Sequence, residues 1–126
     1  MGVMNPGAVM KNIIPVVMAG VIGIYGLIVA VLISSAVIAP SSGKNIDGES
    51  VLVNTYGWDA GFKHFAAGIC CGLSGVGAGY AIGAVGDIGV KMVGLEPRLF
   101  VGLVLIMIFA EAVALYGLIV SLILSS

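Results

Sequence analysis

Glu111 is the residue of this chain whose type and position could do chemistry. It lies 13 residues after Arg98 and 14 before Ser125, in a run that has no other charged side chain. If this run is a helix, a rise of about 1.5 Å per residue places the carboxyl group about 20 Å from either end. That is the middle of a bilayer, where a carboxylate costs a few kcal/mol or more and is usually functional.

The chemistry that such an acid offers is proton transfer. At roughly 100° per residue, Glu111 shares its helix face only with apolar side chains, namely Val104, Met107, Leu115, Leu118 and Leu122. Desolvation on that face favours the protonated, neutral carboxyl group unless a cation approaches. A group that is neutral against lipid and ionised beside a fixed positive charge can carry protons between two half-channels.

The alternative is a structural acid. A neighbouring backbone carbonyl or a tyrosine hydroxyl could satisfy the Glu111 carboxyl group, which would then only stabilise a contact between helices. Tyr25 and Tyr116 are the possible carboxylate neighbours in the sequence.

The composition shows what kind of element must hold this acid. Of 126 residues, 60% are hydrophobic and 9% are charged, and the mean hydropathy is +1.23. Soluble domains carry about a quarter charged residues, so we expect an integral membrane protein in contact with the lipid bilayer. The net charge of −1 offers no basis for nucleic-acid binding. Cys70 and Cys71 are adjacent, and neighbours on a helix point to different faces, so we expect them to form no metal site. The sequence has no P-loop, and we expect no cofactor.

The hydropathy pattern predicts an all-α membrane protein with a single membrane domain over residues 1–126. The expected spans are about 11–39, 61–90 and 99–124, and a polar loop occupies 40–59. Three spans place the N-terminus and the 91–98 link on one side of the membrane, with three Lys or Arg residues against two on the other side. This excess favours a cytoplasmic location for the first side.

The first and third spans are related by an internal repeat. Residues 24–35 align with residues 115–126 at an offset of 91, and the same offset superposes Pro6 on Pro97 and Gly20 on Glu111. The match indicates a duplicated helical hairpin in which only one half carries the acid. In the second half a glycine-rich helix comes before the proline-started helix. We therefore expect a four-helix, ring-forming ancestor whose first helix would lie upstream of Met1; the alternative is a genuine three-helix variant.

The second span carries a stripe of glycines within an arc of about 80°. Its members are Gly68, Gly72, Gly75, Gly79, Gly83 and Gly86. Small residues let helix backbones approach closely. The stripe therefore predicts either one close helix pair within the chain or an inner ring of helices packed at small radius.

Together these motifs resemble the 16 kDa proteolipid family, the c-type proteolipids of eukaryotic V-type proton ATPases. The matching stretches are 13–20, 24–29, 72–75, 81–83, 85–87, 97–102, 108–112 and 115–120. The chain departs from the family's pattern in its missing first helix, in Leu95-Glu96 where the family carries a glutamine pair, and in a longer loop at 40–59.

The resemblance implies a function for each part. Glu111 matches the family's proton-carrying carboxylate, in a homo- or hetero-oligomeric ring that turns against a stator subunit bearing an arginine. The chain would not be an enzyme by itself, since other V-type ATPase subunits hydrolyse ATP. The implied location is a vacuolar, lysosomal or other acidified endomembrane. Protons are favoured over sodium, because the chain has no Gln and its one Thr lies in the loop.

Three alternatives remain open. The chain could be a related ring isoform present in fewer copies, a structural or pore-forming proteolipid, or a truncated fragment without function.

Overall fold

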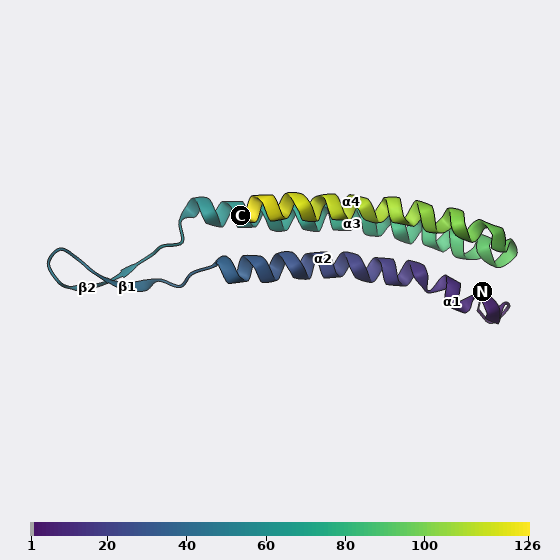
Figure 1. Cartoon of the computed structure of the whole chain (residues 1–126), viewed down its shortest axis with the longest axis horizontal. Helices are drawn as coiled ribbons and strands as arrows, with labels where there is room; N and C mark the ends of the chain where they lie inside the picture. Colours follow the sequence, from purple (N-terminus) through teal and green to yellow (C-terminus); the bar gives the residue numbers. More distant parts are fainter. Residues whose placement is uncertain (1) are drawn as a thin grey trace.

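The computed structural model describes residues 2–126 and consists mainly of three long helices. These are α2 (Ile14–Ala36), α3 (Trp58–Leu95) and α4 (Phe100–Ser125). Each is long and apolar enough to cross a membrane, α2 together with the short turns that precede it. The helices α3 and α4 run antiparallel side by side, and α2 lies along them (Figure 1). The predicted all-α membrane fold is confirmed.

The internal repeat is visible in the way the first and third spans begin. Short 3-10 turns, η1 (Pro6–Ala8) and η2 (Pro97–Leu99), start at the two superposed prolines. Proline is well placed there because its missing N–H would have no helical partner. The short helix α1 (Val9–Asn12) then stops before α2, whereas α4 continues without a break. Pro15 explains the difference, since its ring would clash with a carbonyl one turn earlier, and the equivalent residue in α4 is Ile106.

A small hairpin occupies the segment expected as a polar loop. The strands β1 (Ser41–Lys44) and β2 (Ser50–Val53) pair antiparallel, with Ser41 opposite Val53. Gly48 closes the turn with φ +82°, a conformation that suits glycine. The sequence analysis did not predict these strands. The hairpin stands beyond the ends of the helices, and its residues are almost all exposed (Figure 1).

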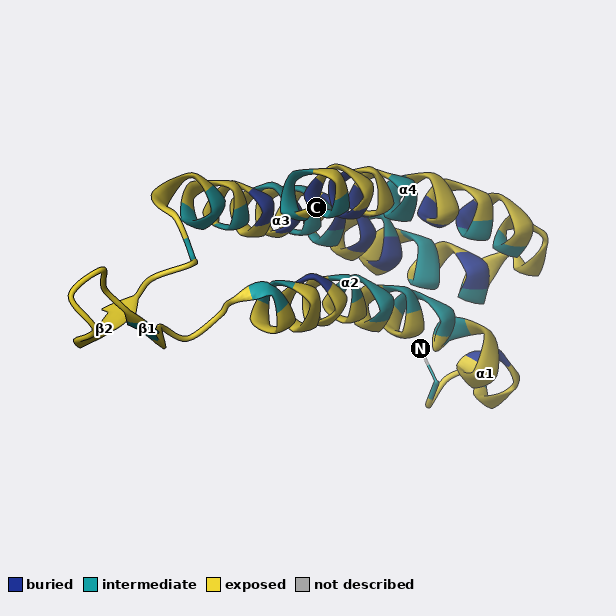
Figure 2. Cartoon of the chain, turned by 60° about the vertical axis from the view of Figure 1, so that its left-hand side comes forward, coloured by how far each residue is buried: buried dark blue, intermediate teal, exposed yellow. Residues whose placement is uncertain are grey.

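The core lies where the helices face one another (Figure 2). One buried cluster joins α3 and α4 through Ile82, Val93, Leu103 and Met107. The second cluster adds α2 and consists of Val29, Cys71 and Leu118. Val29 is the only buried residue of α2, so most of this helix presents apolar side chains outward.

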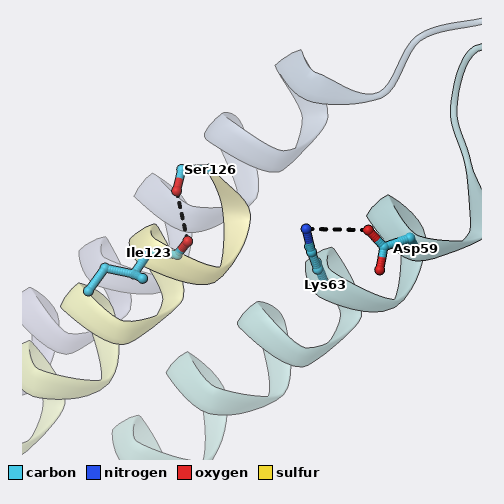
Figure 3. A network of polar contacts seen from close by, with 4 residues as sticks. All are labelled: Asp59, Lys63, Ile123 and Ser126. Atoms are coloured by element: carbon cyan, nitrogen blue, oxygen red, sulfur yellow. Dashed lines mark hydrogen bonds and ion pairs between the residues drawn. The ribbon is translucent and has the colours of Figure 1, made fainter.

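Polar contacts gather at the helix ends. An exposed ion pair of 3.3 Å joins Asp59 and Lys63 in the first turns of α3, beside the last turn of α4, where the Ser126 hydroxyl donates to the Ile123 carbonyl (Figure 3). At the opposite end of α3, Asp87 and Lys91 form a second exposed pair of 3.3 Å. Such pairs are worth a few tenths of a kcal/mol each.

The N-terminal segment and the link between α3 and α4 lie at the same end of the molecule. The Lys11 ammonium sits 5.5 Å from the centre of the Phe100 ring. A small cavity between them is lined by residues of both segments, including Asn5, Lys11 and Pro97. The hairpin lies at the other end (Figure 1). This is the arrangement that three spans require.

Candidate functional site

Glu111 lies near the middle of α4, partly buried between helices. It is 11 residues from Phe100 and 14 from Ser125, or roughly 17 and 21 Å along the axis. It is the only charged residue of α2 and α4 together. Its neighbour Ala110 packs on the core cluster of α3 and α4, so the backbone that carries the acid is fixed by packing.

The Glu111 carboxyl group is accessible from outside the molecule. Among residues 2–126, no ion pair or hydrogen bond includes it, and the three ion pairs all lie at helix ends. Within the same residues, Asn12 Oδ1 is the one buried side-chain oxygen or nitrogen without a partner. Both Glu111 oxygens therefore keep some surface exposed. A group in this state can exchange a proton with a group outside the chain.

The two tyrosines named as possible neighbours lie in different surroundings. Tyr25 of α2 packs on the cluster of Val29, Cys71 and Leu118, and Leu118 lies two turns after Glu111 on the same face of α4. Tyr116 follows Glu111 on α4 itself but is 64% exposed. Tyr25 therefore lies toward the face of α4 that carries Glu111, whereas Tyr116, five residues after Glu111, points about 140° away from it.

The glycine stripe of α3 is largely uncovered by the described residues. Only Gly86 is buried, against Pro15 of α2, while Gly75 approaches Ile22. The other four glycines of the stripe have no heavy atom within 4 Å of where a side chain would begin. Three members of the stripe, Gly79, Gly83 and Gly86, line a groove of about 560 Å³ between α2 and α3.

The close contact between α3 and α4 uses other small residues. A side chain at Gly117 would overlap Ser74, and one at Gly89 would overlap Leu103. The buried Ser121 hydroxyl donates to the Ala67 carbonyl at 2.7 Å across the interface and contacts the Gly117 carbonyl at 2.8 Å. The sequence analysis did not assign these residues to packing. The internal repeat could have pointed to them, because small residues occupy both positions in both halves: Gly117 matches Gly26, and Ser121 matches Ala30.

Nothing in the described part of the chain gathers metal ligands. Within residues 2–126, no three His, Cys, Asp or Glu side chains come together in a way that could hold a metal ion. Cys70 and Cys71 are free, and Cys71 is buried in the core.

Comparison with known proteins gives consistent matches over the helices. The family model that describes the C-type subunit of ATP synthase matches residues 1–33 and 65–124, which leaves out the hairpin. The chain is 53% identical over its whole length to the V-type proton ATPase 16 kDa proteolipid of Ascaris suum, and the match covers 71% of that protein.

Relatives from distant organisms match equally well. The V-type proton ATPase 16 kDa proteolipid of Chrysotila carterae is 58% identical over the whole chain and 71% of its own length. The corresponding proteolipid of Bos taurus is 52% identical, over the whole chain and 72% of its own length. With its helices, its repeat and its mid-span acid, the chain belongs to the 16 kDa proteolipid family of V-type proton ATPases, within the wider family of the ATP synthase C-type proteins.

Proposed function

We propose that this chain is a subunit of the membrane rotor ring of a V-type proton ATPase and that Glu111 carries the proton. The observation that supports the proposal most directly is the position of Glu111. It is the one acid in the middle of a span, and its oxygens are not fully buried within the chain. The relatives named above are subunits of proton ATPases. Proton transport is the function that an acid in this position could serve.

The proposed mechanism follows from the cost of charge in lipid. While Glu111 faces lipid, the protonated form is favoured, because an ionised carboxylate there costs several kcal/mol. When the ring turns and brings Glu111 beside the arginine of a stator subunit, the positive charge favours the carboxylate and the proton leaves. A proton from the opposite half-channel then neutralises the acid before it returns to lipid.

The chain's own contribution is to carry and position the proton, without catalysing a reaction. ATP hydrolysis belongs to other subunits of the complex, which turn the ring. The expected location is the membrane of an acidified compartment, such as a vacuole or lysosome, with the link between α3 and α4 facing the cytoplasm.

The absence of an internal partner for Glu111 favours transport over a structural role. A structural acid should hold a neighbouring helix through a hydrogen bond or an ion pair. Among residues 2–126, Glu111 forms neither, and Tyr25 of α2 packs on the apolar cluster of Val29, Cys71 and Leu118.

The test combines chemical labelling with a substitution. A hydrophobic carbodiimide reacts with protonated carboxyl groups in apolar surroundings, so we expect it to modify Glu111 in native membranes at neutral pH and to stop ATP-driven acidification. The Glu111→Gln variant should assemble at the normal level but acidify vesicles at least about tenfold more slowly.

Glu96→Gln is the matched control, because Glu96 is an acid of the exposed link whose carboxylate pairs with Arg98, at 3.8 Å. It should leave labelling and acidification unchanged. A Glu111→Gln complex that pumps normally would exclude the proton-carrier role. Loss of assembly in proportion to loss of pumping would instead support a structural proteolipid, and failure of the wild-type chain to enter the complex would support a non-functional fragment. A count of copies per complex separates the main ring component from a minor isoform.

A further inference from the structure

A cavity lined by aromatic side chains lies where the hairpin leads into α3 (Figure 1). Its volume is about 520 Å³, which is within the range of small-molecule sites, about 300–1,000 Å³. Four of the nine Phe, Trp and Tyr residues of the chain line this cavity, namely Tyr56, Trp58, Phe62 and Phe65. The proton role proposed for Glu111 makes no use of it.

The rings surround a space that a glycine leaves open. Trp58, Phe62 and Phe65 fall within an arc of about 60° on the first turns of α3, at roughly 100° per residue. The ring centres of Trp58 and Phe62 are 6.4 Å apart. Tyr56 precedes the helix and lies against it at Gly61, where an added side chain would begin 3.6 Å from the Tyr56 ring. Because Gly61 has no side chain, space remains between Tyr56 and the other three rings.

The polar side chains of the lining already have partners. The Tyr56 hydroxyl forms a hydrogen bond with Nδ1 of His64, and the two rings stack with their centres 5.5 Å apart. The Asn54 side-chain oxygen accepts a hydrogen bond from the Tyr56 N–H at 3.1 Å. None of the lining residues in the described part of the chain is charged. The cavity therefore offers a ligand mainly the surfaces of aromatic rings.

Contact with lipid chains does not explain why these side chains are aromatic. Trp58 is 87% exposed, Phe62 is 66% exposed and Phe65 is 67% exposed. The exposed large side chains of α2 are all aliphatic, and those of α4 are mostly so. Aliphatic residues thus serve where the helices meet acyl chains, and the aromatic cluster at the start of α3 requires another reason.

The cavity lies at the level of the lipid headgroups. The Ser121 hydroxyl donates to the Ala67 carbonyl, so these two residues of antiparallel helices are at the same level. Four residues further toward this end, Lys63 is level with Ser125, the last residue of α4, and Figure 3 shows Lys63 beside the last turn of α4. Trp58 therefore lies about 7 Å beyond the end of that span. Aromatic rings at this level meet headgroups.

A quaternary ammonium group is the part of a headgroup that such a cavity recognises. Its positive charge is attracted to the negative faces of aromatic rings, and its methyl groups need no hydrogen-bond acceptor. A phosphate or carboxylate would find no basic side chain in the lining, and a primary ammonium would leave N–H donors unpaired. We propose that this cavity binds the trimethylammonium group of a phosphatidylcholine headgroup from the surrounding bilayer. The site goes beyond the proton-carrier role and does not depend on it.

Trp58 provides a direct test, because it is the only tryptophan of the chain and lines the cavity. The full chain is purified in a maltoside detergent, which carries no ammonium group, and choline is added. We expect a saturable change in Trp58 emission. The neutral 3,3-dimethylbutan-1-ol has the shape of choline without its charge and should need at least about tenfold higher concentrations. Ethanolamine has the charge without the methyl groups and should also act more weakly.

A lipid arm tests the source of the group. Addition of phosphatidylcholine to the same sample should remove the response to choline, because the lipid headgroup then occupies the cavity. Addition of phosphatidylethanolamine should leave the response in place.

Three variants assign the response to the cavity. Phe62→Leu keeps an apolar side chain but removes one ring, and it should weaken choline binding about two- to fivefold. Gly61→Leu fills the space between the rings without removing any of them and should abolish the response. Phe109→Leu is the matched control, because Phe109 is 74% exposed but lies on α4, near the middle of the span. It should leave the response unchanged. Circular dichroism verifies that each variant retains its helices.

Several results would overturn the proposal. The absence of a saturable response to choline would mean that the rings only rest among headgroups. Equal potency of choline and 3,3-dimethylbutan-1-ol would mean an apolar groove without preference for a cation. A choline response that survives phosphatidylcholine would show that the lipid does not occupy the site, and an equal loss in Phe109→Leu and Phe62→Leu would show that the response arises elsewhere. None of these results bears on whether Glu111 carries protons.

Discussion

At the scale of single residues, the surroundings of Glu111 are set by α2 as much as by α4. Tyr25 of α2 is the tyrosine directed toward the face of α4 that carries Glu111, because it packs on Val29 and Leu118. No hydrogen bond joins the Tyr25 hydroxyl to Glu111 in the structure; a hydroxyl that turns to donate to the carboxylate when the proton leaves would stabilise the charged form by about 0.5–1 kcal/mol net. We therefore expect Tyr25 to influence, in this way, how readily Glu111 gives up its proton.

The substitution Tyr25→Phe tests this influence. Without the hydroxyl, the carboxyl group should remain protonated more of the time, and its reaction with a hydrophobic carbodiimide should become about two- to fivefold faster. The rate of Glu111 modification, followed by mass spectrometry, is the measurement. Tyr116→Phe is the matched control and should leave the rate unchanged; equal effects of the two substitutions would contradict the assigned neighbour.

At the scale of helices, the contact between α3 and α4 depends on small residues. Gly117 lies against Ser74, and the buried Ser121 hydroxyl joins α4 to the Ala67 carbonyl of α3. A membrane offers little hydrophobic driving force between helices, so close packing and such hydrogen bonds supply the stability. These contacts hold the helix that carries Glu111 in a fixed rotation.

The repeat supplies a matched pair for this prediction. Gly117→Ala should lower the stability of the chain in detergent by about 1–3 kcal/mol, because the added methyl group overlaps Ser74. Gly26→Ala places the same change at the equivalent residue of α2, where nothing lies within 4 Å, and should be neutral or stabilise by up to about 1 kcal/mol. Thermal unfolding of the purified chain measures both. Similar losses from the two variants would contradict the assigned contact.

The sequence predicted the helices well because long apolar runs and the repeat are strong local signals. It could not predict the strands, since Ser41–Lys44 reads SSGK, with no alternation of apolar and polar residues. It predicted that Glu111 would be in mid-span, but not that Tyr25 rather than Tyr116 would lie toward its face of α4. That choice depends on the rotation of α2 against α4, which a pattern on one helix does not contain.

At the scale of the whole molecule, the two ends differ in what they expose. One end carries the N-terminal turns and the link with Glu96 and Arg98, and the other carries the hairpin (Figure 1). The proposed function has the link face the cytoplasm, and the small excess of Lys and Arg on that side of the membrane favours the same orientation.

Sidedness can be measured with cysteines at the two ends. In sealed vesicles with their cytoplasmic face outward, an impermeant maleimide should label Arg98→Cys at once and Ser42→Cys only after the membrane is opened. The native Cys70 and Cys71 lie within α3 and should stay unlabelled in the unsubstituted chain. Labelling of Ser42→Cys in intact vesicles would reverse the proposed orientation.

The hairpin also has a practical consequence for the study of motion. Its strands are exposed and stand clear of the helix bundle, and the family match omits them. A fluorescent dye or an antibody fragment attached at the Asn45–Glu49 turn would therefore be carried by the chain without disturbing a helix contact. In a single complex tethered to a surface, the path of such a label would reveal whether the labelled chain moves in a circle, and with what step.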